Sequence, residues 1–209
     1  KKLLTFSKTI VKGLDRDDKV KKIGNELKKN FPNRFKFYQK TFSQLDNVTN
    51  SLVDVVIFDL GLSSIQLNDF KRGFSFKSNE NLDMSMGLNN ISAQDVINKL
   101  SELELKLIIK IFGEEKEAAR IAKNIVKFRS EKKIIKVQDL VEIIEKSKKK
   151  NYTSKINPCT KTFQALRIFV NKEITELING IINATKFLKP GGKILVVSFH
   201  SIEDKIVKY

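Results

Sequence analysis

Three short polar motifs carry the strongest chemical signal in this chain. They read DLGLSSIQL at residues 59–67, KRGFSF at 71–76 and LDMSM at 82–86. The first follows an apolar run at 53–58 that predicts a buried strand. In open α/β sheets, ligands bind in loops beyond the carboxyl ends of strands. A carboxylate, a glycine and two serines at such a place therefore predict the floor of a ligand pocket.

Within that loop, Asp59 is the strongest single candidate. A buried carboxylate without a partner would be costly at the end of an apolar strand. It must be satisfied by backbone N–H groups of residues 61–64 or by a ligand, and we favour a ligand.

Two further residues stand at comparable places. Asp15 follows an apolar segment at 9–14, where a carboxylate can accept hydrogen bonds from both hydroxyls of a ribose. Acids are also common at strand-to-helix turns, and Asp17 could cap the next helix. Phe42 follows a strand candidate at 35–38, and its ring could contact a flat base or belong to the core of a chain with 15 Phe.

The only histidine, His200, has Ser201, Glu203 and Asp204 beside it. Neighbours in one short turn rarely act as nucleophile, base and orienting acid, and neither a Gly-x-Ser-x-Gly elbow nor a P-loop occurs, so a hydrolase is disfavoured. The single Cys159 excludes an internal disulfide or a cysteine-cluster metal site. We expect a reducing, cytoplasmic compartment.

The spacing of apolar residues predicts the elements that position these side chains. Strand, helix, strand and strand follow one another up to residue 59, which indicates a parallel α/β sheet. Capping boxes at Ser92 and Ser101, followed by apolar residues at helical spacing, predict an all-helical insertion. One long helix from Thr162 to Leu188 and a second fully buried strand at 193–199 complete the pattern. We predict sheet core at 1–90 and 158–209, with the helical insertion at 91–157.

Charge favours a polyanionic partner. The net charge is +16, from 40 basic and 24 acidic residues. Neutralising phosphates releases counterions, so such a balance is typical of nucleic-acid binding. The alternative is a general drift in composition with lysines on solvated faces. The sequence has no run of 18 apolar residues, so it predicts no membrane-spanning helix.

In order along the chain, the motifs resemble those of the RsmH (MraW) family. Three more stretches agree, GLDRD at 13–17, TFQALRIFVNKE at 162–173 and SFHSIEDK at 198–205. These are bacterial methyltransferases that modify the N4 of a cytidine in the decoding region of 16S ribosomal RNA of the small subunit. The resemblance implies a Rossmann-like class I methyltransferase sheet with a helical insertion after its fourth strand.

The cofactor implied by the resemblance is S-adenosylmethionine. Asp15 would hold its ribose, Phe42 would border its adenine, and Asp59 and Gln66 would complete the pocket. Two departures stand out. Ile65 occupies a position that is usually proline, and the family's Gly-Gly-His loop after the first strand is absent, as are the final strands. We therefore expect these 209 residues alone to bind the cofactor poorly or not at all, and to be inactive.

Transfer from a sulfonium donor to an amine should be an in-line displacement that depends on positioning. Asp59, or a backbone carbonyl at 61–64, could orient the amine of an unstacked base. The tract at 148–150 and four single residues are candidate RNA contacts, each of which could instead be solvated surface or core: Arg72, Phe74, Lys161 and Arg167. The rival functions are a nucleotide-dependent oxidoreductase and a non-catalytic or truncated RNA-binding relative.

Overall fold

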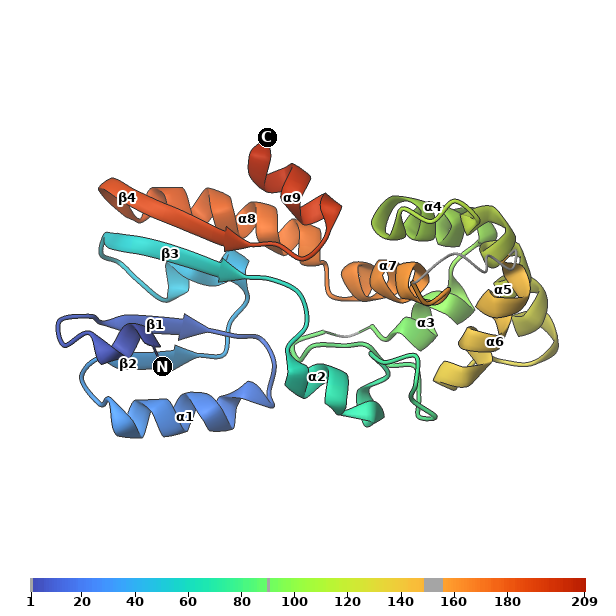
Figure 1. The fold of residues 1–209 in the computed structure, drawn as a ribbon, viewed down its shortest axis with the longest axis horizontal. Coiled ribbons are helices and arrows are strands. Elements are labelled where there is room, and N and C mark those ends of the chain that lie inside the picture. The colour runs from blue at the N-terminus through green and yellow to red at the C-terminus, as the bar shows by residue number, and fades with distance from the viewer. Residues whose placement is uncertain (1, 90, 149–155) are drawn as a thin grey trace. The chain divides into compact units, whose positions relative to one another are not determined.

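A computed structural model describes residues 2–89, 91–148 and 156–209 (Figure 1). The chain divides into two compact units. We call Lys1–Gly61, Met86–Leu88 and Ile174–Tyr209 the sheet unit. We call Leu62–Ser85 and Asn89–Glu173 the helical unit.

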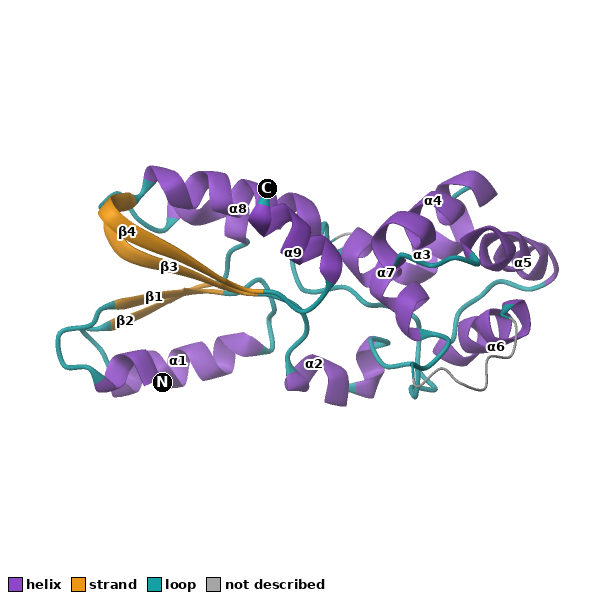
Figure 2. Cartoon of the chain, turned by 45° about the horizontal axis from the view of Figure 1, so that its top comes forward, coloured by secondary structure: helices purple, strands orange, loops and turns teal. Residues whose placement is uncertain are grey.

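The sheet unit contains parallel strands in two pairs. β1 (Val11–Leu14) pairs with β2 (Phe35–Tyr38), and β3 (Val53–Asp59) pairs with β4 (Leu188–Val197). Among the described residues the pairs form two separate sheets. The carboxyl ends of the strands point the same way, as Figures 1 and 2 show. The predicted mixed α/β fold with parallel strands is confirmed.

One face of the β3–β4 sheet is covered and the other is open. α8 (Glu173–Lys186) supplies Leu177 and Ala184 to a buried cluster with Phe58 and Leu60. A Cβ at Gly180 would lie 2.8 Å from Phe42 Cβ and 2.9 Å from the Phe58 ring, so glycine permits this close packing. The opposite face shows apolar side chains that are 45–49% exposed: Val55, Ile57, Leu195 and Val197. The expectation of two fully buried strands is therefore wrong, because only one face is packed.

The remaining elements of the sheet unit are short. α1 (Val20–Asn30) connects β1 to β2, and α9 (Ser201–Lys208) follows β4. The 3₁₀ helices are η1 (Lys2–Thr5) and η2 (Phe42–Asn47).

The helical unit is built from short amphipathic helices around an apolar core. Its elements are α2 (Ser64–Asn68), η3 (Phe70–Arg72), α3 (Ala93–Lys99), α4 (Glu102–Gly113), α5 (Ala118–Glu131), α6 (Val137–Ser147) and α7 (Thr160–Val170). The capping boxes predicted at Ser92 and Ser101 are confirmed, since each serine accepts the N–H three residues on. No described helix is long and apolar enough to cross a bilayer.

The single long helix expected over 162–188 is wrong. α7 ends at Val170 and α8 begins at Glu173. Between them Lys172 has φ of +50°, and buried Asn171 donates from its amide to the carbonyl of Met84 at 2.8 Å. That tertiary hydrogen bond holds the break. β4 also begins earlier than expected, with a register irregularity opposite Val53 and Val55.

Candidate functional site

The two acids singled out from the sequence follow parallel strands of the sheet unit. Asp15 comes directly after β1, and its N–H donates to the Tyr38 carbonyl at 3.2 Å, which extends the β1–β2 pairing. Its half-buried carboxylate accepts the N–H of Asp17 at 2.8 Å. Asp17 is buried and accepts the N–H of Lys19 at 3.0 Å, so it shapes the turn into α1. The turn thus fixes the Asp15 carboxylate at the carboxyl end of β1.

Asp59 is the last residue of β3, and its side chain is exposed. The argument that this carboxylate is buried and needs a partner is therefore wrong. Asp59 pairs in register with Val197, and alternation along β3 places it on the open face with Val55 and Ile57. What holds from the sequence is its position at the carboxyl end of a strand, where ligands bind in α/β sheets.

The loop after β3 meets the turn after β4. Leu60 donates its N–H to the Val197 carbonyl at 3.2 Å, which carries the pairing one residue past the strand. Gly61 has φ of +81°, and a Cβ there would lie 3.0 Å from the Phe199 ring. Glycine is required at this position both for its backbone conformation and for the space that the ring occupies.

Phe42 lies at the start of η2 and is half-buried. Its ring meets the Phe58 ring edge to face, with centroids 5.3 Å apart and planes at 86°. The side chain therefore packs against the core cluster while part of it stays accessible to solvent. This packing supports a role of Phe42 in the core. Because the ring is partly exposed, its contact with a flat base stays a prediction.

Gln66 belongs to the helical unit and is buried. Its Oε1 accepts the Ser63 N–H at 2.9 Å, and Ser63 Oγ accepts the Gln66 N–H at 3.3 Å. This reciprocal capping box starts α2. Ile65 lies in the first turn of the same helix, where proline is tolerated without being needed, so the departure at this position leaves the helix intact.

Each predicted RNA contact has a structural role inside the helical unit. Arg72 donates to the Ser85 carbonyl at 2.9 Å, and its guanidinium lies 5.1 Å from the centroid of the Phe74 ring, which is buried. Lys161 donates to the Glu114 carbonyl at 3.0 Å, beyond the end of α4. These contacts favour the core or structural interpretation of the three residues, and RNA contact stays a prediction.

Arg167 forms a bidentate pair with Glu173, with both N–O distances 2.9 Å. The two side chains are 12% and 14% exposed, so the pair is largely removed from water. Of the basic tract at 148–150, Lys148 pairs with buried Glu115 at 2.6 Å, while residues 149 and 150 lie outside the described residues.

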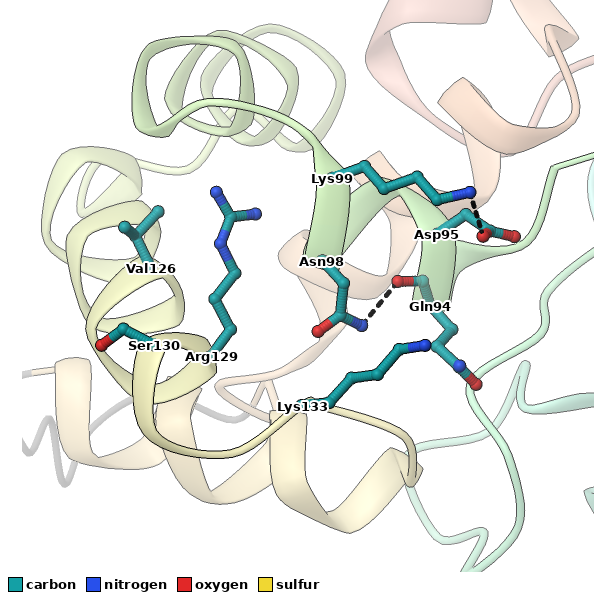
Figure 3. Close-up of a pocket in the computed structure, with 8 residues that line it drawn as sticks. All are labelled: Gln94, Asp95, Asn98, Lys99, Val126, Arg129, Ser130 and Lys133. Carbon is teal, nitrogen blue, oxygen red and sulfur yellow. Dashed lines mark hydrogen bonds and ion pairs between the residues drawn. The ribbon is translucent and has the colours of Figure 1, made fainter.

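The structure also contains a hollow that the sequence did not predict. It has a volume of about 450 Å³ and lies between α3 and α5 (Figure 3). Arg129 crosses it to donate to the Ile97 and Leu100 carbonyls at the end of α3. A second hollow, of about 480 Å³, runs along α1. Neither hollow is lined by a predicted site residue. The first could not be predicted from the sequence, because its lining residues come from two separate segments, at 94–99 and 126–133.

The residues at the carboxyl edge of the sheet unit suit a particular ligand chemistry. Carboxylates accept hydrogen bonds from hydroxyl and amino groups, and the half-buried ring of Phe42 offers an apolar contact to a planar base. These groups fit a nucleoside-containing cofactor.

Comparison with known proteins identifies the family. The model of the MraW methylase family matches residues 1–209. "Ribosomal RNA small subunit methyltransferase H" of Ehrlichia canis is 45% identical over 213 residues, which cover 100% of this chain and 72% of that protein. The protein of the same name from Bartonella henselae is 46% identical over 195 residues, or 93% of this chain and 56% of that protein. The resemblance found in the sequence is confirmed, and the chain belongs to the MraW methylase family.

Proposed function

We propose that this protein transfers a methyl group from S-adenosylmethionine to the N4 of a cytidine in the decoding region of 16S ribosomal RNA. The substrate is proposed to be the RNA of the small ribosomal subunit, and the compartment the cytoplasm. The relatives are named as methyltransferases of small-subunit ribosomal RNA, which supports this substrate. The observation that carries the proposal is a methylase-family chain with acids directly after parallel strands, Asp15 after β1 and Asp59 at the end of β3.

Asp15, Phe42 and Gln66 would contact different parts of the cofactor. Asp15 would accept hydrogen bonds from the ribose hydroxyls, as carboxylates after strands do in nucleotide sites. Phe42 would border the adenine with the part of its ring that does not contact Phe58. Gln66 would complete the cofactor pocket through the loop before α2, which its capping box with Ser63 shapes. When bound, S-adenosylmethionine supplies an electrophilic methyl group on a sulfonium.

Asp59 would orient the acceptor. The lone pair of the cytosine amine is delocalised into the ring, so an oxygen that accepts an N4 hydrogen would favour rehybridisation toward the donor. The exposed carboxylate at the end of β3 can accept that hydrogen from a base that has left its stack. Positioning the amine in line with the methyl group would then supply much of the rate.

We further propose a Rossmann-like class I methyltransferase core at 1–90 and 158–209 with a helical insertion at 91–157. Support comes from the parallel strands in the first and last parts of the chain and the run of helices from Ala93 to Ser147. RNA contact by Arg72, Phe74, Lys161 and Arg167 is part of the proposal, and it is supported by the net charge of +16.

The test is methyl transfer from labelled S-adenosylmethionine to small-subunit RNA by the protein made from its complete gene. Nucleoside analysis of the product should find N4-methylated cytidine. Asp59→Asn should lose most of the transfer rate at a saturating concentration of the cofactor. The control is Asp54→Asn, on the same strand but far from its carboxyl end, where Asp54 pairs with Lys189 on the surface at 2.8 Å. A wild-type transfer rate in Asp59→Asn would contradict the amine-orienting role of Asp59. Absence of N4-methylated cytidine with the wild type would contradict the proposed function.

A non-catalytic RNA-binding relative is the second candidate, favoured by the same charge balance. It predicts tight RNA binding by the complete protein without any cofactor-dependent transfer. The same assay therefore separates the two.

A further inference from the structure

Phe199 is an exposed aromatic side chain at the carboxyl edge of the sheet unit. It lies two residues beyond the end of β4 and is 66% exposed. Alternation from Leu195 and Val197 places it on the open face of the β3–β4 sheet. Since Asp59 pairs with Val197 and is exposed as well, the carboxylate and the ring lie at the same end of the same face.

Glu203 holds the backbone of Phe199 in place, and Gly61 lies against its ring. Its N–H donates to Oε2 of buried Glu203 at 2.8 Å. Glu203 in turn has its N–H 3.4 Å from Nδ1 of His200 and its Oε1 3.1 Å from Nε2 of the same imidazole. On the other side the ring lies against Gly61, where no Cβ would fit without a shift. The backbone that carries this large apolar ring is thus held in place, and the ring is left open to solvent.

An exposed aromatic ring at the same sheet end as a hydrogen-bond acceptor matches the needs of a base that must be held outside its stack. Every base has an apolar π-face, and stacking on a protein aromatic group compensates for the lost base stacking. A residue whose backbone is already held before binding loses less conformational freedom on contact.

We propose that Phe199 is the stacking surface for the target cytosine, on which the base lies while Asp59 accepts a hydrogen from its N4 amine. This inference rests on the proposed function and adds a substrate-binding residue to it. His200 and Glu203 then act as positioning residues that fix the turn carrying the ring.

The opposing interpretation is that Phe199 simply continues the apolar open face, as Leu195 and Val197 do. A substitution series separates the two. Stacking requires a flat ring, so Phe199→Tyr and Phe199→Trp should retain function while Phe199→Leu and Phe199→Ala lose it. An apolar packing role requires bulk and hydrophobicity, so leucine should then substitute well and tyrosine or tryptophan poorly.

The experiment measures kcat and KM for small-subunit RNA, together with the dissociation constant for S-adenosylmethionine, in the protein made from its complete gene. We expect Phe199→Leu to lower kcat/KM for RNA by about 5- to 100-fold, with unchanged cofactor affinity, because stacking contributes of this order per base. Phe199→Tyr should lie within about 3-fold of the wild type. The matched control is Phe6→Leu, since Phe6 is 67% exposed and precedes the amino end of β1 by five residues.

Each outcome decides. Equal activity of Phe199→Leu and the wild type overturns the proposal while leaving the methyltransferase function intact. A Phe199→Leu variant with weakened cofactor binding assigns the ring to the cofactor and also overturns it. If the wild type itself transfers no methyl group, the proposed function fails. The stack is then tested with RNA that carries a fluorescent cytosine analogue at the target position. Its fluorescence should change on binding to the wild type and not on binding to Phe199→Leu.

Discussion

The two units of this chain bury their apolar side chains to different extents. Among the described residues, every one of the largest fully buried side chains belongs to the helical unit: Leu82, Met84, Ile97, Leu105, Ile109, Ile121, Ile125, Ile134, Leu140, Ile144, Leu166 and Ile168. The sheet unit packs one face of β3–β4 and leaves the other open. The comparison indicates that stability is concentrated in the helical unit, while exposed reactive groups lie in the sheet unit.

The difference follows from how each unit satisfies its secondary structure. In the helical unit, α2, α3 and α4 satisfy N–H groups of their first turns through capping boxes, and the helices bury an apolar stripe. Strands have two faces and two edges, and each needs a neighbour. A face left open beside strand ends can bind a ligand, but it contributes little to stability.

The largest effect is expected in the core of the helical unit. Leu105 on α4 is fully buried, so Leu105→Ala should lower the free energy of unfolding by about 3–4 kcal/mol through lost burial and a residual cavity. Leu103 on the same helix is 62% exposed, and Leu103→Ala should cost less than about 0.5 kcal/mol. Chemical denaturation monitored by circular dichroism measures both. Similar costs for the two variants would contradict the burial described for this unit.

The Arg167–Glu173 pair should have the next largest effect. Arg167→Gln removes both charge-assisted hydrogen bonds of this largely buried pair, and we expect the free energy of unfolding to fall by about 2–3 kcal/mol. The double variant Arg167→Met/Glu173→Leu should recover part of that loss, because apolar side chains then replace a largely buried ion pair. Normal thermal stability of Arg167→Gln together with weakened RNA binding would show instead that the arginine serves RNA.

Helix capping in the helical unit gives a smaller, pH-dependent effect. Ser92→Ala should cost about 1 kcal/mol through loss of the cap on α3. Hydrogen bonds from Lys99 and then from Ser92 hold the pKa of Asp95 far below its ordinary 3.8. The folded pKa is the lower one, so the stabilisation by Asp95 is present above pH 3.8 and is lost as the pH falls below it.

Thermal unfolding at pH 7 and at pH 3 checks this capping prediction. Asp95→Asn should be less stable than the wild type at pH 7, with a smaller difference at pH 3. Glu102→Gln, which changes an exposed acid in the first turn of α4, is the control. If the stability difference between Asp95→Asn and the wild type is larger at pH 3 than at pH 7, the Asp95 carboxylate does not stabilise the fold in its charged form.

The smallest effect is expected on the open face of the sheet unit. Val55 and Val56 are neighbours on β3 that point to opposite faces, and Val56 packs against the buried cluster while Val55 is 46% exposed. Val55→Thr should change stability by less than about 0.5 kcal/mol, and Val56→Thr should cost about 1–2 kcal/mol. Equal costs would mean that the open face is covered in solution, which would break the comparison between the two units.

Local patterns in the sequence predicted much of the fold. Capping boxes and apolar spacing gave the starts of α3 and α4, and strand composition gave β1, β2 and β3. The break between α7 and α8 was missed because the apolar spacing runs on through it. It depends on a hydrogen bond between Asn171 and Met84, which are 87 positions apart. No short-range pattern reports such a contact.

The candidate site shows the same division. Position at a strand end was predictable for Asp15 and Asp59, because it depends on the local order of apolar and polar residues. The exposure of Asp59 was not predictable, because an apolar strand does not reveal whether both faces will be covered. Phe199 was not singled out from the sequence, since its contact with Gly61 joins the ends of two strands far apart in sequence.

The central claim, that the carboxyl edge of the sheet unit binds S-adenosylmethionine, is tested most directly by calorimetric titration of the protein made from its complete gene. Asp15→Asn should weaken cofactor binding by about 10- to 100-fold, the range for hydrogen bonds to a charged group. Asp18→Asn, an exposed acid three residues on, should leave the affinity unchanged. Wild-type affinity in Asp15→Asn would contradict the claim.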